Sequence, residues 1–143
     1  SVNKEDFLFG ISKSMKFLCA NPDIVVDRGE VRQWCAGALA KMYTEMGGES
    51  LYFGKPHNAI YDLARMRLAE LGTPIDSKKI LAIGDGIGTD IKGANSQEID
   101  SLFVTGGLAA KETQTSYSPN PEALEKYIAK QKVQCTYSIG YLR

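Results

Sequence analysis

The sequence of 143 residues predicts an α/β fold with a mainly parallel sheet. Short apolar runs, typical of strands, alternate with longer stretches in which apolar residues recur every three or four positions, as in amphipathic helices. Glycine-rich turns end several of these segments. Strands that alternate with helices form βαβ units with right-handed crossovers, and these units place neighbouring strands in parallel.

In the first half of the chain, two apolar runs predict strands. One ends at the turn Asn21-Pro22-Asp23 and the other at Asp27. We interpret Asp27 as a solvated turn residue rather than a nucleophile, because an Arg-Gly pair follows it where a second acid would be needed. The elements predicted here are strands at 16–20, 24–27 and 50–53 and helices at 31–46 and 56–71, the last beginning at Pro56.

The stretch 79–94 carries the clearest sign of a functional site. Four apolar residues at 80–83 are typical of a strand buried on both faces of a parallel sheet, and Asp85 follows where such a strand opens onto the ligand side. Thr89 is placed to cap the next helix, with Asp90 in its first turn. Two carboxylates at this spacing can face one point, which suits Mg²⁺ with a phosphate beside it. The same pattern also occurs in α/β proteins that bind no metal.

Lys55 is a third candidate for this site. It stands between Gly54 and Pro56, after a predicted strand and before a predicted helix, and therefore on the same expected edge of the sheet as Asp85. An exposed lysine in a turn is usually just solvated. A lysine fixed at the ligand edge of a sheet is well placed to hold a phosphate or an acidic side chain.

After the central stretch, the sequence predicts the rest of the sheet and its helices. These elements are a helix at 90–97 whose Ile91 and Ala94 pack on the sheet, a strand at 100–105, a polar, mobile loop at 111–119, a helix at 121–131 capped near Asn120, and an edge strand at 133–139.

Composition argues against several classes of function. Basic and acidic residues are equal at 17 each, so no excess of positive charge exists to neutralise the phosphates of a nucleic acid. No apolar run approaches the roughly 20 residues that a membrane span needs. The three cysteines lack a C-x-x-C spacing, which favours a reduced, cytoplasmic protein. The single histidine, His57, has no evident partner for a zinc site.

Three segments, in this order, resemble one family: 17–23 (FLCANPD), 53–56 (FGKP) and 84–94 (GDGIGTDIKGA). Together they resemble the C-terminal half of a haloacid dehalogenase (HAD) superfamily hydrolase of subclass IIA, the NagD-like and nitrophenylphosphatase-like phosphatases. The resemblance runs from about Lys16 through Gly107. It implies a three-layer Rossmann-like (HAD-like) core with a mainly parallel sheet, here incomplete, plus a remnant of the cap domain.

The resemblance also implies roles for parts of the chain. Residues 1–23 correspond to the end of the cap and the return to the core, and residues 24–143 to the C-terminal half of the core. Lys55 matches the lysine that steadies the nucleophilic aspartate and the phosphoryl group. Asp85 matches the acid that binds Mg²⁺, and Asp90 matches its second, supporting acid. Metal and lysine together would offset the charge of a phosphoryl group during its transfer to a carboxylate.

The chain departs from the family's pattern in one large respect. Family members begin with a strand that ends in Asp-x-Asp, which supplies the nucleophile and the general acid/base, and no Asp-x-Asp occurs in this sequence. We therefore expect a fragment of a Mg²⁺-dependent phosphatase that acts on a small phosphorylated metabolite, with the nucleophile outside this chain. The chain alone is expected to be inactive. We expect neither nucleic acid nor membrane as a partner, and a homo-oligomer or a missing N-terminal half stays open.

Three other functions compete with this one. A nucleotide-binding module could use the glycines at 84–88 as a phosphate cradle, although Asp85 would repel a pyrophosphate there unless a metal intervened. A phospho-acceptor signalling domain also uses acids and a lysine around Mg²⁺, but its acidic pair would precede the lysine. A non-catalytic scaffold with a relic site is the fourth. An Asp-x-Asp upstream of this sequence would select the phosphatase.

Overall fold

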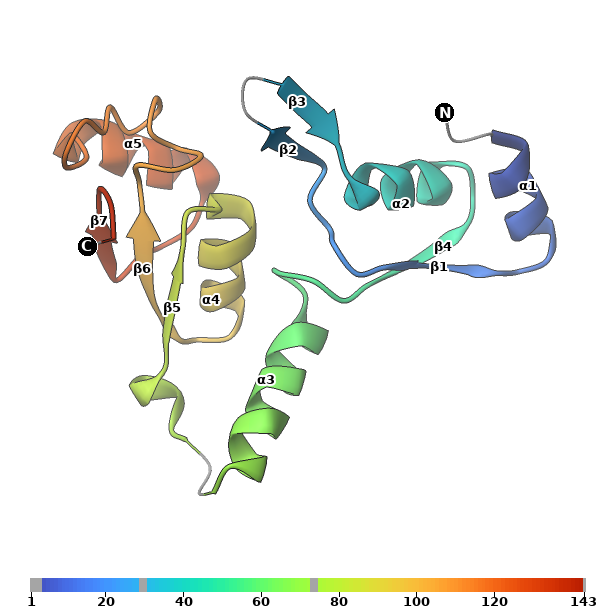
Figure 1. Ribbon diagram of the computed structural model, residues 1–143, viewed down its shortest axis with the longest axis horizontal. Helices are drawn as coiled ribbons and strands as arrows, with labels where there is room; N and C mark the ends of the chain where they lie inside the picture. The colour runs from blue at the N-terminus through green and yellow to red at the C-terminus, as the bar shows by residue number, and fades with distance from the viewer. Residues whose placement is uncertain (1–3, 29–30, 73–74, 143) are drawn as a thin grey trace. The chain divides into compact units, whose positions relative to one another are not determined.

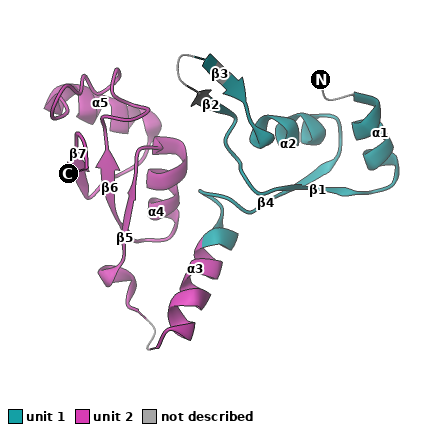
Figure 2. Cartoon of the chain, in the orientation of Figure 1, with its two compact units in different colours: residues 1–60 teal, residues 61–143 magenta. Residues whose placement is uncertain are grey.

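The computed structural model describes residues 4–28, 31–72 and 75–142. The chain forms two compact units, residues 1–60 and residues 61–143 (Figure 2). Each unit combines helices with parallel strand pairs, which confirms the predicted α/β class. The units divide at a different place from the cap and core segments implied by the resemblance, and that assignment stays a prediction.

Unit 1 is built on a parallel pair of strands, β1 and β4 (Figure 1). Their register aligns Lys16 with Glu49 and Cys19 with Tyr52. Both strands lie where the sequence predicted them. The elements of this unit are α1 (Lys4–Ser12), β1 (Lys16–Cys19), β2 (Val25–Arg28), β3 (Val31–Trp34), α2 (Ala36–Glu45) and β4 (Glu49–Tyr52), and α3 (Asn58–Glu70) begins in it and continues into unit 2.

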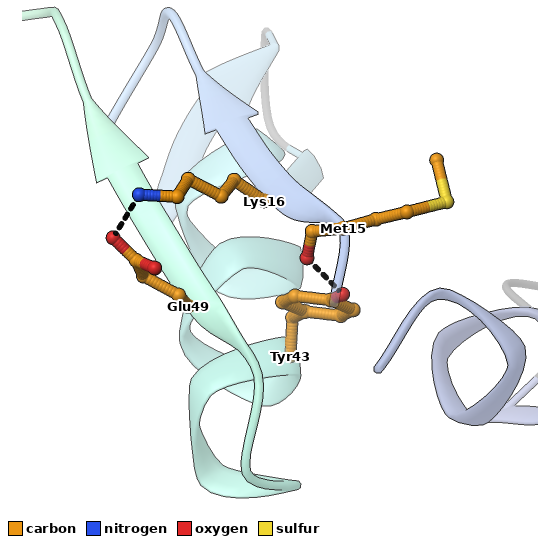
Figure 3. Close-up of polar contacts among 4 residues, drawn as sticks. All are labelled: Met15, Lys16, Tyr43 and Glu49. Carbon is orange, nitrogen blue, oxygen red and sulfur yellow. Dashed lines mark hydrogen bonds and ion pairs between the residues drawn. The ribbon is translucent and has the colours of Figure 1, made fainter. Parts of the chain in front are cut away.

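An aromatic cluster and two polar contacts hold unit 1 together. The rings of Phe7 and Phe17 lie with their centroids 5.3 and 5.5 Å from that of Tyr43, which is 3% exposed. Tyr43 Oη donates a hydrogen bond of 2.6 Å to the carbonyl oxygen of Met15, and Lys16 Nζ lies 2.9 Å from Glu49 Oε1 (Figure 3). The ion pair is exposed and contributes little, whereas the buried tyrosine links α2 to the residue before β1.

The predicted helix at 31–46 is wrong for its first turn. Val31–Trp34 forms strand β3, which pairs antiparallel with β2, and the helix starts only at Ala36 after the extended residue Cys35. A spacing of three between the apolar residues Val31 and Trp34 is compatible with a helix and with a strand. The segment forms a strand because it pairs with β2, which contains two valines. Asp27 lies within β2 rather than in a turn.

Unit 2 carries a three-stranded parallel sheet in the order β5-β6-β7, with β7 at one edge as predicted (Figure 1). Its elements are η1 (Ser77–Lys79), β5 (Leu81–Gly84), η2 (Ile87–Ile91), α4 (Lys92–Ser96), β6 (Asp100–Val104), α5 (Pro121–Gln131) and β7 (Tyr137–Ile139), in addition to most of α3. Strands β5 and β6 and helix α5 agree with the predicted ranges to within about a residue at each end.

The core of unit 2 lies between the sheet and its helices. Ile91, Phe103 and Ala109 are essentially without exposed surface, and Leu124 and Tyr127 of α5 pack against them. The predicted packing of Ile91 is therefore confirmed. β5, however, is not buried on both faces, because Leu81 and Ile83 are 44% and 52% exposed and both point to the same side of the strand.

The predicted start of α5 is confirmed, whereas that of α3 is wrong. Asn120 caps α5, since its Oδ1 accepts a hydrogen bond of 3.0 Å from the N–H of Ala123. Pro56, in contrast, lies in the turn before α3, which begins at Asn58. Among the described residues, no helix is long and apolar enough to cross a membrane.

Candidate functional site

Asp85 follows the last residue of β5 at the carboxyl end of the sheet in unit 2. Its side chain is half-buried, and Oδ2 accepts a hydrogen bond of 3.1 Å from the backbone N–H of Leu108. Gly107 lies against the same carboxylate: a Cβ at this position would stand 2.1 Å from Asp85 Oδ2. Only a residue without a side chain leaves room for the carboxylate here.

Asp90 lies in the helical turn after β5 and is 8% exposed. Its Oδ2 accepts a hydrogen bond of 3.0 Å from the N–H of Gly86, so the acid closes the loop on itself. A Cβ at Gly84 would stand 2.2 Å from Asp90 Cγ, which shows how tightly the loop wraps this carboxylate. The loop therefore holds the Asp90 carboxylate in its interior rather than at the surface.

The predicted cap at Thr89 is wrong. The helical segment begins directly after Gly86, as a π-helical turn over Ile87–Ile91, and Thr89 lies inside it. The N–H groups of Asp90 and Ile91 both donate to the carbonyl oxygen of Gly86, at 2.7 and 3.1 Å. A wide turn of this kind occurs often at functional sites, and here it brings the Asp90 carboxylate back to the start of the loop.

Hydrogen bonds tie the first half of the loop predicted at 111–119 to the residues just after β6. Thr105 and Thr113 are fully buried, and Thr113 Oγ1 donates to the carbonyl oxygen of Ala109 at 2.8 Å. The hydroxyl of Thr115 lies 2.8 Å from that of Thr113 and donates to Thr105 Oγ1 at 2.9 Å. Thr105 Oγ1 in turn donates to the carbonyl oxygen of Ile139 in β7 at 3.2 Å. Three hydroxyls thus tie this segment to the sheet.

Lys55 belongs to unit 1, in the turn that follows β4. A Cβ at the preceding Gly54 would stand 2.3 Å from Cδ of Pro22, so the turn lies against the Asn21-Pro22-Asp23 segment at the end of β1. His57 stacks on Tyr52 with ring centroids 4.9 Å apart. Lys55 itself is exposed.

The structure brings two of the three predicted site residues, Asp85 and Asp90, together on one loop of unit 2. Lys55 lies in the other unit, and β4 pairs with β1 rather than with β5, so its place beside Asp85 stays a prediction. The main-chain donors of Gly86 and Leu108 were missed. The pair Gly106-Gly107 directly after a strand was the available signal for the second of these donors.

The donor set fits a hard cation in part. Carboxylate oxygens are the ligands that Mg²⁺ prefers, and Asp85 Oδ1 accepts no hydrogen bond from any residue that the structure describes. In the described parts of the chain, no group of three or more His, Cys, Asp or Glu side chains could hold a metal ion. These acids can therefore supply only some of the ligands of such an ion, and the others must come from water, a phosphate or another segment.

Comparison with known proteins points to one group of enzymes. The model of the Hydrolase_like family, described as HAD-hydrolase-like, matches residues 52–130, which is more than half of the chain. Among solved structures, a haloacid dehalogenase-like hydrolase from Brucella suis 1330 is 35% identical with a TM-score of 0.73, and the match covers 98% of this chain and 49% of that one. A p-nitrophenyl phosphatase from Archaeoglobus fulgidus shares the fold at 19% identity and a TM-score of 0.74, with 98% and 50% covered.

A curated relative agrees with these structures. The 5'-nucleotidase YutF of Bacillus subtilis is 30% identical over 125 residues, which are 85% of this chain and 47% of that protein. The chain thus spans about half the length of YutF and of both solved structures.

Proposed function

Because the chain belongs to the HAD-hydrolase-like family, we propose that it is the C-terminal part of a phosphatase that hydrolyses a small phosphate monoester. The names of its relatives support this: one is a p-nitrophenyl phosphatase and another a 5'-nucleotidase, and both names describe the cleavage of a phosphate ester. We call the longer protein of which this chain would be a part the parent protein.

The observation that carries the proposal is the loop with Asp85 and Asp90. One acid stands at the carboxyl end of a parallel strand with an oxygen available, and the other closes the loop behind it. In the proposed enzyme, Asp85 would hold Mg²⁺ and Asp90 would keep the loop in shape. When bound, the ion would supply positive charge that lowers the cost of the negative charge on the phosphoryl group.

Lys55 would place its ammonium beside the same phosphoryl group. The nucleophile would be an aspartate outside this chain: its carboxylate forms a bond to phosphorus while the bond from phosphorus to the ester oxygen breaks. The leaving oxygen would take a proton from the general acid of the same Asp-x-Asp and depart as an alcohol, and water would then hydrolyse the aspartyl phosphate to release inorganic phosphate. The nucleotide-binding alternative is weaker, because the loop holds a carboxylate where the main-chain cradle of a pyrophosphate would have to be.

The test is a comparison of the parent protein with its Asp85→Asn variant, in the hydrolysis of p-nitrophenyl phosphate and of nucleoside monophosphates with Mg²⁺. We expect turnover to fall by about 100-fold or more, because the charge on the phosphoryl group loses its counter-ion. Asp62→Asn, which removes an exposed acid from α3, is the control and should keep its turnover. A parent protein whose Asp85→Asn variant stays as active as the control would contradict the proposed function.

A second comparison concerns Lys55. In the parent protein, Lys55→Ala should lower turnover far more than Lys41→Ala, which removes an exposed lysine from α2. Equal activity of the two variants would remove Lys55 from the proposed site.

A further inference from the structure

The position of Asp85 depends on a segment more than twenty positions further along the chain. We propose that residues 106–115, which we call the Gly107 turn, act as the positioning element of the proposed metal site: the turn holds Oδ2 of Asp85 and leaves Oδ1 as the single oxygen offered to the cation. This inference rests on the proposed function, since it concerns the same acid. It adds which atom binds and which residues hold the acid in place.

The contact of the turn with Asp85 has two parts. The N–H of Leu108 donates to Oδ2 at 3.1 Å, which satisfies one lone pair and fixes the plane of the carboxylate. Gly107 lies so close that an added Cβ would stand 2.1 Å from Oδ2 and 2.7 Å from Asp85 Cβ. The turn thus limits rotation of the carboxylate from one side, and Oδ1 is the oxygen that accepts no hydrogen bond from the described residues.

The Gly107 turn can position Asp85 because hydrogen bonds from threonine hydroxyls fix the turn itself. Thr113 Oγ1 donates to the carbonyl oxygen of Ala109 at 2.8 Å, one residue after the donor N–H of Leu108. The Thr115 hydroxyl donates to Thr105 Oγ1 just after β6 and lies 2.8 Å from Thr113 Oγ1, and Thr105 Oγ1 donates to the carbonyl oxygen of Ile139 in β7. Because Thr105 and Thr113 are fully buried, their hydroxyls would be costly to leave unpaired, and the network keeps one geometry. Thr113 is therefore a positioning residue, two hydrogen bonds away from the metal.

The turn itself is tested with Gly107→Ala in the parent protein, with Mg²⁺ affinity measured by titration calorimetry. The added methyl group must push the Asp85 side chain aside, and we expect the affinity to fall by about tenfold or more, as for lost supporting contacts at other metal sites. Gly88→Ala is the matched control, because a Cβ there has no other atom within 4 Å. Equal Mg²⁺ affinity in Gly107→Ala and Gly88→Ala would overturn the inference.

Thr113 is tested with a pair of variants. Thr113→Val keeps the shape and loses the hydroxyl, whereas Thr113→Ser keeps the hydroxyl. We expect Thr113→Val to weaken Mg²⁺ binding several-fold with an unchanged KM for the phosphate ester at saturating Mg²⁺, and Thr113→Ser to restore the affinity. A role in folding alone would lower the melting temperature of Thr113→Val and leave its Mg²⁺ affinity as in the unchanged protein, and that result would count against the inference. If the Gly107→Ala variant does not fold, the Mg²⁺ affinities of Thr113→Val and Thr113→Ser test the inference.

Asp85→Asn separates the two proposals. If it leaves Mg²⁺ binding and turnover intact, the proposed function fails, and the inference fails with it. If it abolishes both while Gly107→Ala and Thr113→Val bind Mg²⁺ as tightly as their controls, the proposed function holds and only the inference fails.

Discussion

At the scale of the residue, the two acids of the loop differ in what their carboxylates do. Asp90 is buried and bonded to the N–H of Gly86, whereas Asp85 is half-buried and bonded through one oxygen to Leu108. Both acids follow from the sequence, since their spacing after a strand is visible in it. The partners do not, because every residue except proline carries a backbone N–H, and only the folded chain shows which ones reach a carboxylate.

Asp90→Ala should destabilise the protein. It removes the acceptor of the buried Gly86 N–H and opens a void within the loop, and the unpaired N–H alone costs about 1–3 kcal/mol. Urea unfolding of the 143-residue chain measures this. Asp90→Asn, which keeps an acceptor oxygen, should lose clearly less, and equal losses would show that the hydrogen bond is unimportant.

Stability should fall at high pH. Burial raises the pKa of the Cys135 thiol above its ordinary 9.0, and burial together with the nearby Glu112 carboxylate raises the pKa of Tyr127 above 10.0. The unfolded chain loses these protons first, so their contribution is complete below about pH 9 and is lost as the pH rises through the pKa values of the folded state. Urea unfolding at several pH values between neutrality and about 11 measures the loss.

The Glu112→Gln variant tests whether the Glu112 carboxylate contributes to the raised pKa of Tyr127. Without the carboxylate, the pKa of Tyr127 should lie closer to its ordinary value, and the variant should lose less stability at high pH than the unchanged chain. An identical pH profile would remove Glu112 as a cause.

At the scale of the element, helices and strands were predicted correctly where several features of the local sequence agreed. Helix α5 has an asparagine cap, a proline in its first turn and an apolar stripe, which all favour the same start, and the structure confirms it. Strand β3 was missed, because antiparallel pairing with β2 outweighed a short helical spacing. The loop at 111–119 was predicted as mobile from its polar composition, but the hydroxyls of Thr113 and Thr115 in its first half are hydrogen-bonded, and composition does not distinguish a hydrated hydroxyl from a paired one.

The contribution of the Asn120 cap to the stability of the protein can be measured directly. Asn120→Ala removes the oxygen that accepts from the Ala123 N–H and should cost about 1 kcal/mol in the free energy of unfolding. Asn120→Asp should retain most of the stability, since aspartate caps as well as asparagine. A loss of the same size in both variants would place the role of this residue elsewhere, such as in its backbone contact with Thr113.

At the scale of the whole molecule, strands of parallel pairs carry exposed apolar side chains. Leu18 of β1 and Ile83 of β5 are 66% and 52% exposed, although each belongs to a parallel strand pair, and parallel sheets are normally covered on both faces. The chain also spans about half the length of its relatives. The strand β5 was predicted as buried because its composition suits a covered sheet, and composition carries no information on whether the cover is part of this chain.

The 143-residue chain by itself should therefore bind a dye for exposed apolar surface, such as ANS, more strongly than the parent protein does. It should also fail to hydrolyse p-nitrophenyl phosphate with excess Mg²⁺, because no Asp-x-Asp is present to supply the nucleophile. Turnover by the chain alone that Lys55→Ala abolishes would show that the nucleophile lies within these residues.

The two main-chain hydrogen bonds of the loop have a spectroscopic consequence. An amide proton that is bonded to a carboxylate resonates at a frequency that depends on the charge of that carboxylate. The amide of Leu108 is bonded to Asp85 and that of Gly86 to Asp90, so each acid has its own reporter in a nitrogen–proton NMR spectrum. Titration with Mg²⁺ should move the Leu108 signal first and farthest, and the two carboxylates can thus be followed separately without a label on either side chain.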